Sequence, residues 1–293
     1  MLSVFQSDGE WLRGCLHVHT TNSDGRKTPQ EVVDFYRDHG FHFVALTDHG
    51  KVTPPDSVDS RGLTIITGAE VGAGKSAVQS TYHWVLVGMT GDLEMPEDRD
   101  STEAIEKLAE QCRLFILAHP YWSGLTGEDM LAVAYYHAVE LFNTGCELET
   151  QRGDSSVHWQ QVLEAGRKVW AVAVDDAHWA IDDGAGGYTM VHTDDSSEEG
   201  IIRAILAGHC YASSGVEVVE LDGDDEGLYL RTNIPCTLRL IAPRPGAGWT
   251  TMRDQPAPAT EFRFTPPEGE FRIELVAPGG EKAWLQPSTW PPQ

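Results

Sequence analysis

Basic residues are scarce in this sequence. Its 293 residues include 21 lysines and arginines against 45 aspartates and glutamates, which gives a formal net charge of −24 at pH 7. The basic residues form no run, and an acidic surface repels nucleic acid and anionic membranes. The composition therefore argues against a nucleic-acid or membrane partner, and we expect most acidic side chains to form a solvated surface.

Cysteine is also sparse, and its positions form no C-x-x-C pair. The five cysteines are odd in number and widely scattered, which argues against a disulfide framework and a zinc ribbon. The sequence has no apolar run of membrane-spanning length, and no basic segment followed by an apolar core at its start. These features predict free thiols and a cytoplasmic protein.

Short apolar runs alternate with helical patterns through roughly the first 210 residues. The runs lie at 15–19, 41–47, 63–67, 84–87, 114–118, 138–142 and 169–174. Between them are helix signals such as Thr28 and Glu31, which form a capping box with Pro29 at the first helical position. Seven strands with intervening helices predict a (β/α) barrel, with a doubly wound open sheet as the alternative. The fourth run follows the third without a helical pattern, so that connection is expected to be irregular.

The pattern changes after about residue 215. Strand-like runs at 216–221, 227–232, 236–241, 260–264 and 271–276 are separated by proline, glycine and aspartate turns, with no helical period. We therefore predict two domains: residues 1–214 form the α/β domain, and residues 215–293 form a small all-β, sandwich-like appendage.

Histidines and carboxylates gather at the ends of the predicted strands. His17 and His19 share one face of the first strand, because residues i and i+2 point the same way. In parallel α/β folds the carboxyl ends of the strands surround one crevice. A single His-x-His is more often structural than a ligand pair, but coincidence at six strand ends is improbable. The residues are His17, His19, Asp24, Asp48, His49, Glu70, His83, His119, Asp176 and His178.

Seven short motifs occur in a characteristic order within residues 12–180. They are His17-Val18-His19, Ser23-Asp24-Gly25, Thr47-Asp48-His49, Gly68-Ala69-Glu70, His83, Ala118-His119-Pro120 and Asp176-Ala177-His178. This order closely resembles the PHP (polymerase and histidinol phosphatase) family of metal-dependent hydrolases. Residues 118–126 and 170–178 resemble one branch of it, which includes carbaryl-hydrolase-like metallohydrolases.

The resemblance implies a distorted (β/α)7 barrel that holds two or three divalent metal ions. The mixture of imidazole and carboxylate ligands suits Zn, Mn or Fe better than Mg or Ca. The implied ligand sets are His17, His19, Glu70 and Asp176 for one ion; Glu70, His83 and His119 for a second; and Asp24, His49 and His178 for a third.

Three other residues are candidates for catalytic roles beside the ions. Asp48 and Asp175 could orient a ligand or accept a proton. Asp175 stands where other PHP members often carry serine, so the surroundings of Asp176 differ from theirs. Arg152, ahead of Arg26 and Lys27, is the candidate clamp for a phosphoryl group, although exposed basic residues are usually only solvated.

We expect the chain to be a metal-dependent phosphoesterase acting on a small phosphorylated metabolite, through attack by a hydroxide held by the ions. The alternative is a carbamate or carboxylic ester hydrolase with the same cluster. A third possibility is a non-catalytic module stabilised by metal, but a structural ion needs only one closed set of four ligands. A nuclease role is disfavoured by the net charge.

Overall fold

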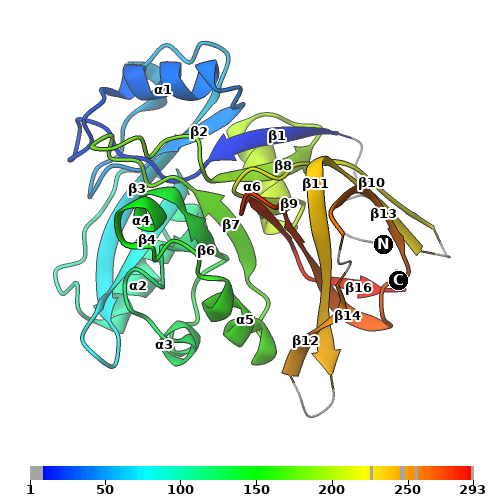
Figure 1. The fold of residues 1–293 in the computed structure, drawn as a ribbon. Helices are drawn as coiled ribbons and strands as arrows, with labels where there is room; N and C mark the ends of the chain where they lie inside the picture. The colour runs from blue at the N-terminus through cyan, green and yellow to red at the C-terminus, as the bar shows by residue number, and fades with distance from the viewer. Residues whose placement is uncertain (1–8, 225–226, 245–247, 255–256, 292–293) are drawn as a thin grey trace.

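The computed structural model describes residues 9–224, 227–244, 248–254 and 257–291. The outer ends of the two predicted domains, residues 1–8 and 292–293, lie outside this part. The chain forms a mixed, strand-rich α/β fold in which one long sheet runs through both regions (Figure 1). Within the described residues, no helix is both long and apolar enough to cross a membrane.

The first region contains the strands that carry the expected motifs. They are β1 (Glu10–Cys15), β2 (Phe43–Leu46), β3 (Thr64–Lys75), β4 (Thr81–Met89), β5 (Cys112–Leu117), β6 (Ala138–Asn143) and β7 (Trp170–Val174). The helices are α1 (Pro29–Asp38), α2 (Thr102–Ala109), α3 (Gly127–Ala132), α4 (Thr144–Thr150), α5 (Ser156–Glu164) and α6 (Glu198–Leu206), with a 3-10 turn η2 (Pro55–Ser57). The predicted capping box of α1 is confirmed, with Thr28 and Glu31 bonded reciprocally.

Strand β4 interrupts the parallel order of this region. Strands β1, β2 and β3 are parallel, as are β5, β6 and β7, but β4 is antiparallel to both β3 and β5. Residues 76–80 alone join β3 to β4, and a parallel crossover needs a dozen residues or more. The beginning of β4 therefore lies beside the end of β3, where His83 is paired with Gly72.

Two strands that the sequence reasoning missed complete this region. Strand β8 (Tyr188–Thr193) is antiparallel to β1 and to β9 (Cys210–Ser213). Polar Thr189 and His192 interrupt the apolar pattern of β8, which hid it. Thr189 Oγ1 bonds both the N–H and the carbonyl of Ala173 in β7, but no backbone ladder joins β7 to β8 in the described residues. The observed sheet is thus mixed. Its strand pairing does not establish the closed (β/α)7 barrel that the sequence predicts.

The C-terminal region is built from strands alone within the described residues. They are β10 (Val218–Asp224), β11 (Gly227–Arg244), β12 (Gly248–Asp254), β13 (Ala259–Phe264), β14 (Gly269–Val276), β15 (Lys282–Leu285) and β16 (Ser288–Trp290). The runs expected at 227–232 and 236–241 are one strand, β11. Its first part pairs with β10 and β13, and its second part pairs with β12 and β14.

The two regions are joined by the sheet and by polar contacts. Strand β15 pairs with β9, and the side chain of Gln286 bonds both backbone groups of Ala171 in β7. The ammonium of Lys282 donates to Asp154 at 2.7 Å. These contacts hold the C-terminal strands against the first region, on the right in Figure 1.

Candidate metal centre

A cavity of about 330 Å³ opens where the carboxyl ends of the parallel strands meet the beginning of β4. His17 and His19 follow β1, Asp48 and His49 follow β2, His119 follows β5, and Asp176 and His178 follow β7. The loops after β1 and β7 are tied by a parallel bridge between Val18 and Ala177. The cavity is lined by Asp24, His49, Glu70, His83, His119, Trp122, Gly145, Cys146, Glu149, Asp176, His178 and Asp183.

Four ligand atoms converge at the buried end of the site. His17 Nε2 lies 3.0 Å from His19 Nε2, 3.3 Å from Glu70 Oε2 and 3.1 Å from Asp176 Oδ1. His19 Nε2 lies 3.3 Å from the same Glu70 oxygen and 3.0 Å from the same Asp176 oxygen. Ligands about 2.0–2.1 Å from a tetrahedral ion are about 3.3 Å apart. The four atoms therefore fit one transition-metal ion.

The other carboxylate oxygen of Glu70 faces a second group. Glu70 Oε1 lies 2.9 Å from His83 Nδ1 and 3.3 Å from His119 Nε2. Asp176 Oδ2 is 3.8 Å from the same His119 nitrogen. Glu70 and Asp176 therefore each direct one oxygen to the buried group and one towards this group, as carboxylates that link two ions would.

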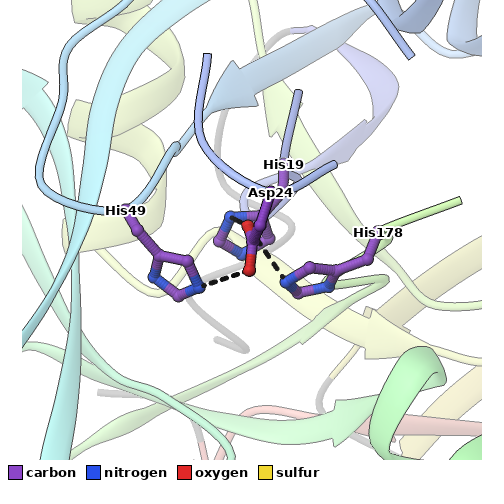
Figure 2. Close-up of side chains that lie close together, drawn as sticks. All are labelled: His19, Asp24, His49 and His178. Atoms are coloured by element: carbon purple, nitrogen blue, oxygen red, sulfur yellow. Dashed lines mark ion pairs between the residues drawn. The ribbon is translucent and has the colours of Figure 1, made fainter. Parts of the chain in front are cut away.

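A third group lies at the open side of the cavity around Asp24 (Figure 2). Its oxygens are 3.5 Å from His49 Nε2, 3.5 Å from His178 Nε2 and 3.7 Å from His19 Nδ1. The Asp24 side chain is 55% exposed, whereas Glu70 is only 2% exposed. This group is thus accessible to solvent. His19 presents one ring nitrogen to it and the other to the buried group.

Seven of the nine predicted ligands line this cavity, and His17 and His19 lie buried behind Glu70 and Asp176. Together the nine form a His/Glu/Asp cluster that could hold metal ions. The sets implied by the family resemblance coincide with these groups, with two additions: His19 also faces the third group, and His49 Nδ1 also lies 2.9 Å from Glu70 Oε2 of the buried group. Glu70 was expected at the end of a strand at 63–67, but β3 continues to Lys75 and Glu70 lies within it. The backbone of Glu70 also pairs with that of His49 in an isolated parallel bridge.

The cluster concentrates negative charge in a buried place. Burial raises the pKa of the Glu70 carboxyl, but the His17 imidazole and hydrogen bonds outweigh burial and hold that pKa well below its usual range. Burial lowers the pKa of His19, but bonds to Asp176 and Glu70 raise it to about 9. Both shifts favour protonated imidazole beside ionised carboxylate. Divalent ions would have to displace those protons.

The backbone is unusual at two of the ligands. His119 has a φ of 26° and Asp176 a φ of 53°, which are uncommon values for residues other than glycine. Hydrogen bonds hold both: the His119 N–H donates to Glu140 Oε2 at 2.9 Å, and the Asp176 N–H donates to the carbonyl of His17 at 2.9 Å. Strained backbone held this way is concentrated at functional sites.

Sequence reasoning missed Glu140 and Asn143 at the end of β6. Both are fully buried. Glu140 Oε1 lies 2.6 Å from His17 Nδ1, and Asn143 Nδ2 donates to Asp176 Oδ2 at 3.1 Å. The available signal was a carboxylate inside the apolar run at 138–142, since burial of an unpaired carboxylate is costly.

Asp48 organises the loop that carries Asp24 and contacts no predicted ligand through its side chain in the described residues. Its carboxylate accepts hydrogen bonds from the N–H and hydroxyl of Thr20, the N–H and hydroxyl of Ser23, and the hydroxyl of Thr53. With both oxygens engaged by five donors, Asp48 fixes the course of residues 20–24.

Asp175 has a similar place beside another loop. It is fully buried and accepts from the hydroxyls of Tyr36 and Thr144 and from the backbone N–H groups of residues 185–187. Burial raises its pKa despite these bonds. The side chain thus joins α1, α4 and the 185–187 loop, and none of these five partners is a predicted metal ligand.

The predicted phosphate clamp lies outside the lining of the cavity. Arg152 is exposed, and its guanidinium stands over the ring of Tyr121 at 5.8 Å. Lys27 stands over Trp179 at 5.1 Å. Among the described residues, neither lysine nor arginine lines the cavity. Trp122, with its ring centroid 5.0 Å from that of His119, is the tryptophan among the described lining residues.

Comparison of the sequence with known proteins finds one partial match. The chain matches no protein-family model. It is 27% identical over 121 residues to an uncharacterised protein of Methanocaldococcus jannaschii, a match that covers 38% of this chain and 68% of that protein.

Three solved structures are similar to this chain. A two-domain protein from Bacteroides vulgatus, which contains a predicted PHP-like metal-dependent phosphoesterase, aligns over 96% of this chain and 95% of its own, with 16% identity and a TM-score of 0.55. A proposed metal-dependent phosphoesterase from Bifidobacterium adolescentis covers 65% of this chain and 96% of its own, with 15% identity and a TM-score of 0.49. An amidohydrolase from Chromobacterium violaceum, with bound sulfate and no metal, covers 67% and 96%, with 16% identity and a TM-score of 0.47. The first of these likenesses establishes that this chain shares the fold of the Bacteroides vulgatus protein along almost its whole length.

Proposed function

We propose that this chain is a metal-dependent hydrolase of the PHP type that cleaves a small phosphate ester. The observation that carries the proposal is the set of five separations of 3.0–3.3 Å among four buried ligand atoms, which suits a transition-metal ion. With the groups around His83 and Asp24, we propose two or three ions in total, drawn from Zn, Mn and Fe.

The fold supports a PHP-type assignment. The Bacteroides vulgatus protein with the same fold contains a predicted PHP-like metal-dependent phosphoesterase, and the ligand motifs of this chain occur in the PHP order. We extend the proposal to a distorted (β/α)7 barrel for residues 1–214 and a small β-sandwich-like domain for residues 215–293. Membership of the carbaryl-hydrolase-like branch rests on sequence resemblance alone.

The two ends of the site differ in their chemical roles. Bound ions would act as Lewis acids that lower the pKa of a water molecule and neutralise charge on a phosphoryl group. His17, His19, Glu70 and Asp176 form the closed end that fixes ligand geometry, because their side chains are buried. Asp24 and its neighbours form the open end, where substrate enters.

Residues beside the ligands are proposed to act by positioning. Asp48 holds the loop of Asp24, and Asp175 holds the 185–187 loop, so each would orient the site rather than accept a proton. Arg152 remains a candidate clamp for a phosphoryl group. It lies two residues beyond the end of α4, which contributes Cys146 and Glu149 to the cavity wall.

The charge and the thiols support proposals about setting and partners. A net charge of −24 penalises long polyanions, so we propose a small-molecule substrate and neither nucleic acid nor membrane as partner. All five cysteines are free and buried, which suits a reducing, cytoplasmic location.

A second candidate function is hydrolysis of a carbamate or carboxylic ester. The observation that favours it is the cavity wall: among the described lining residues it offers Trp122 but no lysine or arginine for a phosphate. The same ions would polarise a carbonyl group as readily as a phosphoryl group.

The two functions can be separated with substrates that share a leaving group. Purified protein loaded with Zn, Mn or Fe is assayed with 1-naphthyl phosphate and 1-naphthyl N-methylcarbamate, both of which release 1-naphthol, with Asp176→Ala as the inactive control. The proposal predicts a higher kcat/KM for the phosphate. Fast release from the carbamate with an inert phosphate would replace it with the second candidate. Failure of both, together with common mono- and diesters, at full metal loading would refute hydrolysis.

A further inference from the structure

Glu140 touches several of the proposed ligands without facing the cavity. It is 0% exposed at the end of β6. Its Oε1 is 2.6 Å from His17 Nδ1, while its Oε2 accepts the backbone N–H of His119 at 2.9 Å and the side-chain amide of Asn143 at 3.0 Å. Asn143 also donates to Asp176 at 3.1 Å. Both oxygens of Glu140 therefore have donors.

The contact with His17 is a hydrogen bond rather than an edge of a metal site. Glu140, His17 and His119 form a group whose atoms lie close enough to surround an ion. However, 2.6 Å is well below the separation of about 3.3 Å expected for two ligands of a tetrahedral ion, and it is typical of a charge-assisted hydrogen bond. A proton on Nδ1 fits this distance, and the lone pair of the ring is then on Nε2.

We propose that Glu140 is a positioning residue that fixes the tautomer of His17, so that Nε2 is free to bind the buried ion. The inference rests on the proposed metal centre. Nε2 is the atom of His17 that faces His19, Glu70 and Asp176. The tautomer of His17 therefore decides whether the four-atom group can supply four ligands to the metal or only three. Through His119 and Asn143 the same carboxylate also braces two neighbouring ligands.

Replacement of Glu140 by glutamine keeps the shape and changes one acceptor into a donor. If the new NH2 group faces His17 Nδ1, the proton of the ring moves to Nε2 and blocks the metal. If the NH2 group instead takes the place of Oε2, it cannot accept the hydrogen bonds from the His119 backbone N–H and the Asn143 side-chain amide. We therefore expect E140Q to weaken the tightest metal-binding step by roughly 10- to 100-fold, the cost usual for residues that orient a ligand.

The test measures metal affinity directly. Dissociation constants for Zn²⁺ are obtained by chelator competition with the full chain, for the wild type, E140Q, H17A and the double variant. If Glu140 acts through His17, the effects of the two substitutions are not additive. E140Q should therefore raise the Zn²⁺ dissociation constant less than threefold in the H17A background. Asp129→Asn is the matched control, because Asp129 is a buried carboxylate whose three donors belong to Ala77 and Thr126, outside the cluster.

Each outcome separates the inference from the proposed function. A wild type that binds no Zn²⁺ refutes the metal centre. If the wild type and E140Q bind Zn²⁺ with equal affinity, the role of Glu140 is refuted. It is also refuted if E140Q lowers Zn²⁺ affinity as much in the H17A background as in the wild type. If E140Q does not fold, proton NMR of the Zn-loaded wild type decides. The inference predicts a strongly downfield His17 Nδ1–H signal, assigned by its absence in H17A, and a signal from Nε2–H instead would overturn it.

Discussion

The Nε2 atoms of His17 and His19 face each other at 3.0 Å in the buried end of the cavity. Asp176 Oδ1 lies within 3.1 Å of both. Two imidazole lone pairs at this distance repel each other, so the pair must either share a proton or bind a common cation. With three carboxylates in the cluster, a divalent ion at this position would remove the repulsion and the excess charge together.

Loss of Glu70 should disturb two ions at once. Its two oxygens face different groups, so Glu70→Ala is expected to lower the metal content by more than one ion per chain and to abolish turnover. His83→Ala, which alters only the second group, should remove about one ion. Plasma mass spectrometry of protein reconstituted and then desalted measures both. Normal metal content and turnover in Glu70→Ala would show that Glu70 does not bridge.

Single ligand losses at the buried end should stop hydrolysis and spare the fold. His19→Ala and Asp176→Ala remove atoms from the four-atom group, so turnover should fall by more than the roughly 10- to 100-fold typical of residues that only orient ligands. Circular dichroism should be unchanged, because both residues lie beyond the strands. His42 is an exposed histidine immediately before β2, and His42→Ala is the control that should keep its turnover. Comparable turnover in all three variants would contradict the assignment.

Asp48 should matter for the open end of the site more than for the closed end. Asp48→Asn sets an NH2 group against at least one of the five donors that the carboxylate accepts. The unfolding free energy should fall by about 1–3 kcal/mol. Metal affinity should fall at the third group, around Asp24, and stay unchanged at the buried group of His17, His19, Glu70 and Asp176. Denaturant titration and stepwise metal titration test the two parts. Equal weakening at both groups would indicate a general effect on the fold.

The link between the two regions should depend on pH in the acid range. Burial raises the pKa of Asp154, but the bond from Lys282 outweighs it and lowers that pKa below the usual value. The pair therefore contributes its stability above the ordinary carboxyl pKa of about 3.9 and loses it as the pH falls through the lower, folded value. Because both side chains are partly exposed, the contribution should be about 0.2–1 kcal/mol. The difference in unfolding free energy between wild type and Asp154→Asn should be constant near pH 5–7 and shrink below pH 4; a difference that grows there would contradict the sign.

The positions of the ligands were predictable because they follow short apolar runs. His17, His49, His119 and Asp176 each lie two or three residues beyond the end of a strand, and the ends of parallel strands share one edge whatever the details of closure. His17 and His19 were expected within the first strand, at 15–19, but β1 ends at Cys15. Strand β4 was harder: its direction depends on the five-residue connection at 76–80, which local periodicity does not weigh. The single strand β11 was divided in the sequence by Pro235, which interrupts the strand pattern.

Contacts between residues distant in sequence could not be predicted in the same way. Glu140 lies 123 positions from His17, and it sits within an apolar run that indicates only a buried strand. Asp48 and Asp175 were recognised as carboxylates near the ligands, but the donors that engage them come from Thr53, Tyr36 and Thr144. Which atoms a buried carboxylate meets depends on tertiary packing, so sequence identifies such residues without their partners.

Anomalous scattering from crystals of metal-loaded protein tests the central claim most directly. Data collected above and below the absorption edge of the loaded metal locate each ion independently of any assumed ligand. The account predicts at least two peaks per chain, one of them about 2.0–2.2 Å from Nε2 of both His17 and His19, with a second beside Glu70 Oε1 or Asp24. Absence of any peak among these atoms after reconstitution with Zn, Mn and Fe in turn would contradict the metal centre and the hydrolase proposed from it.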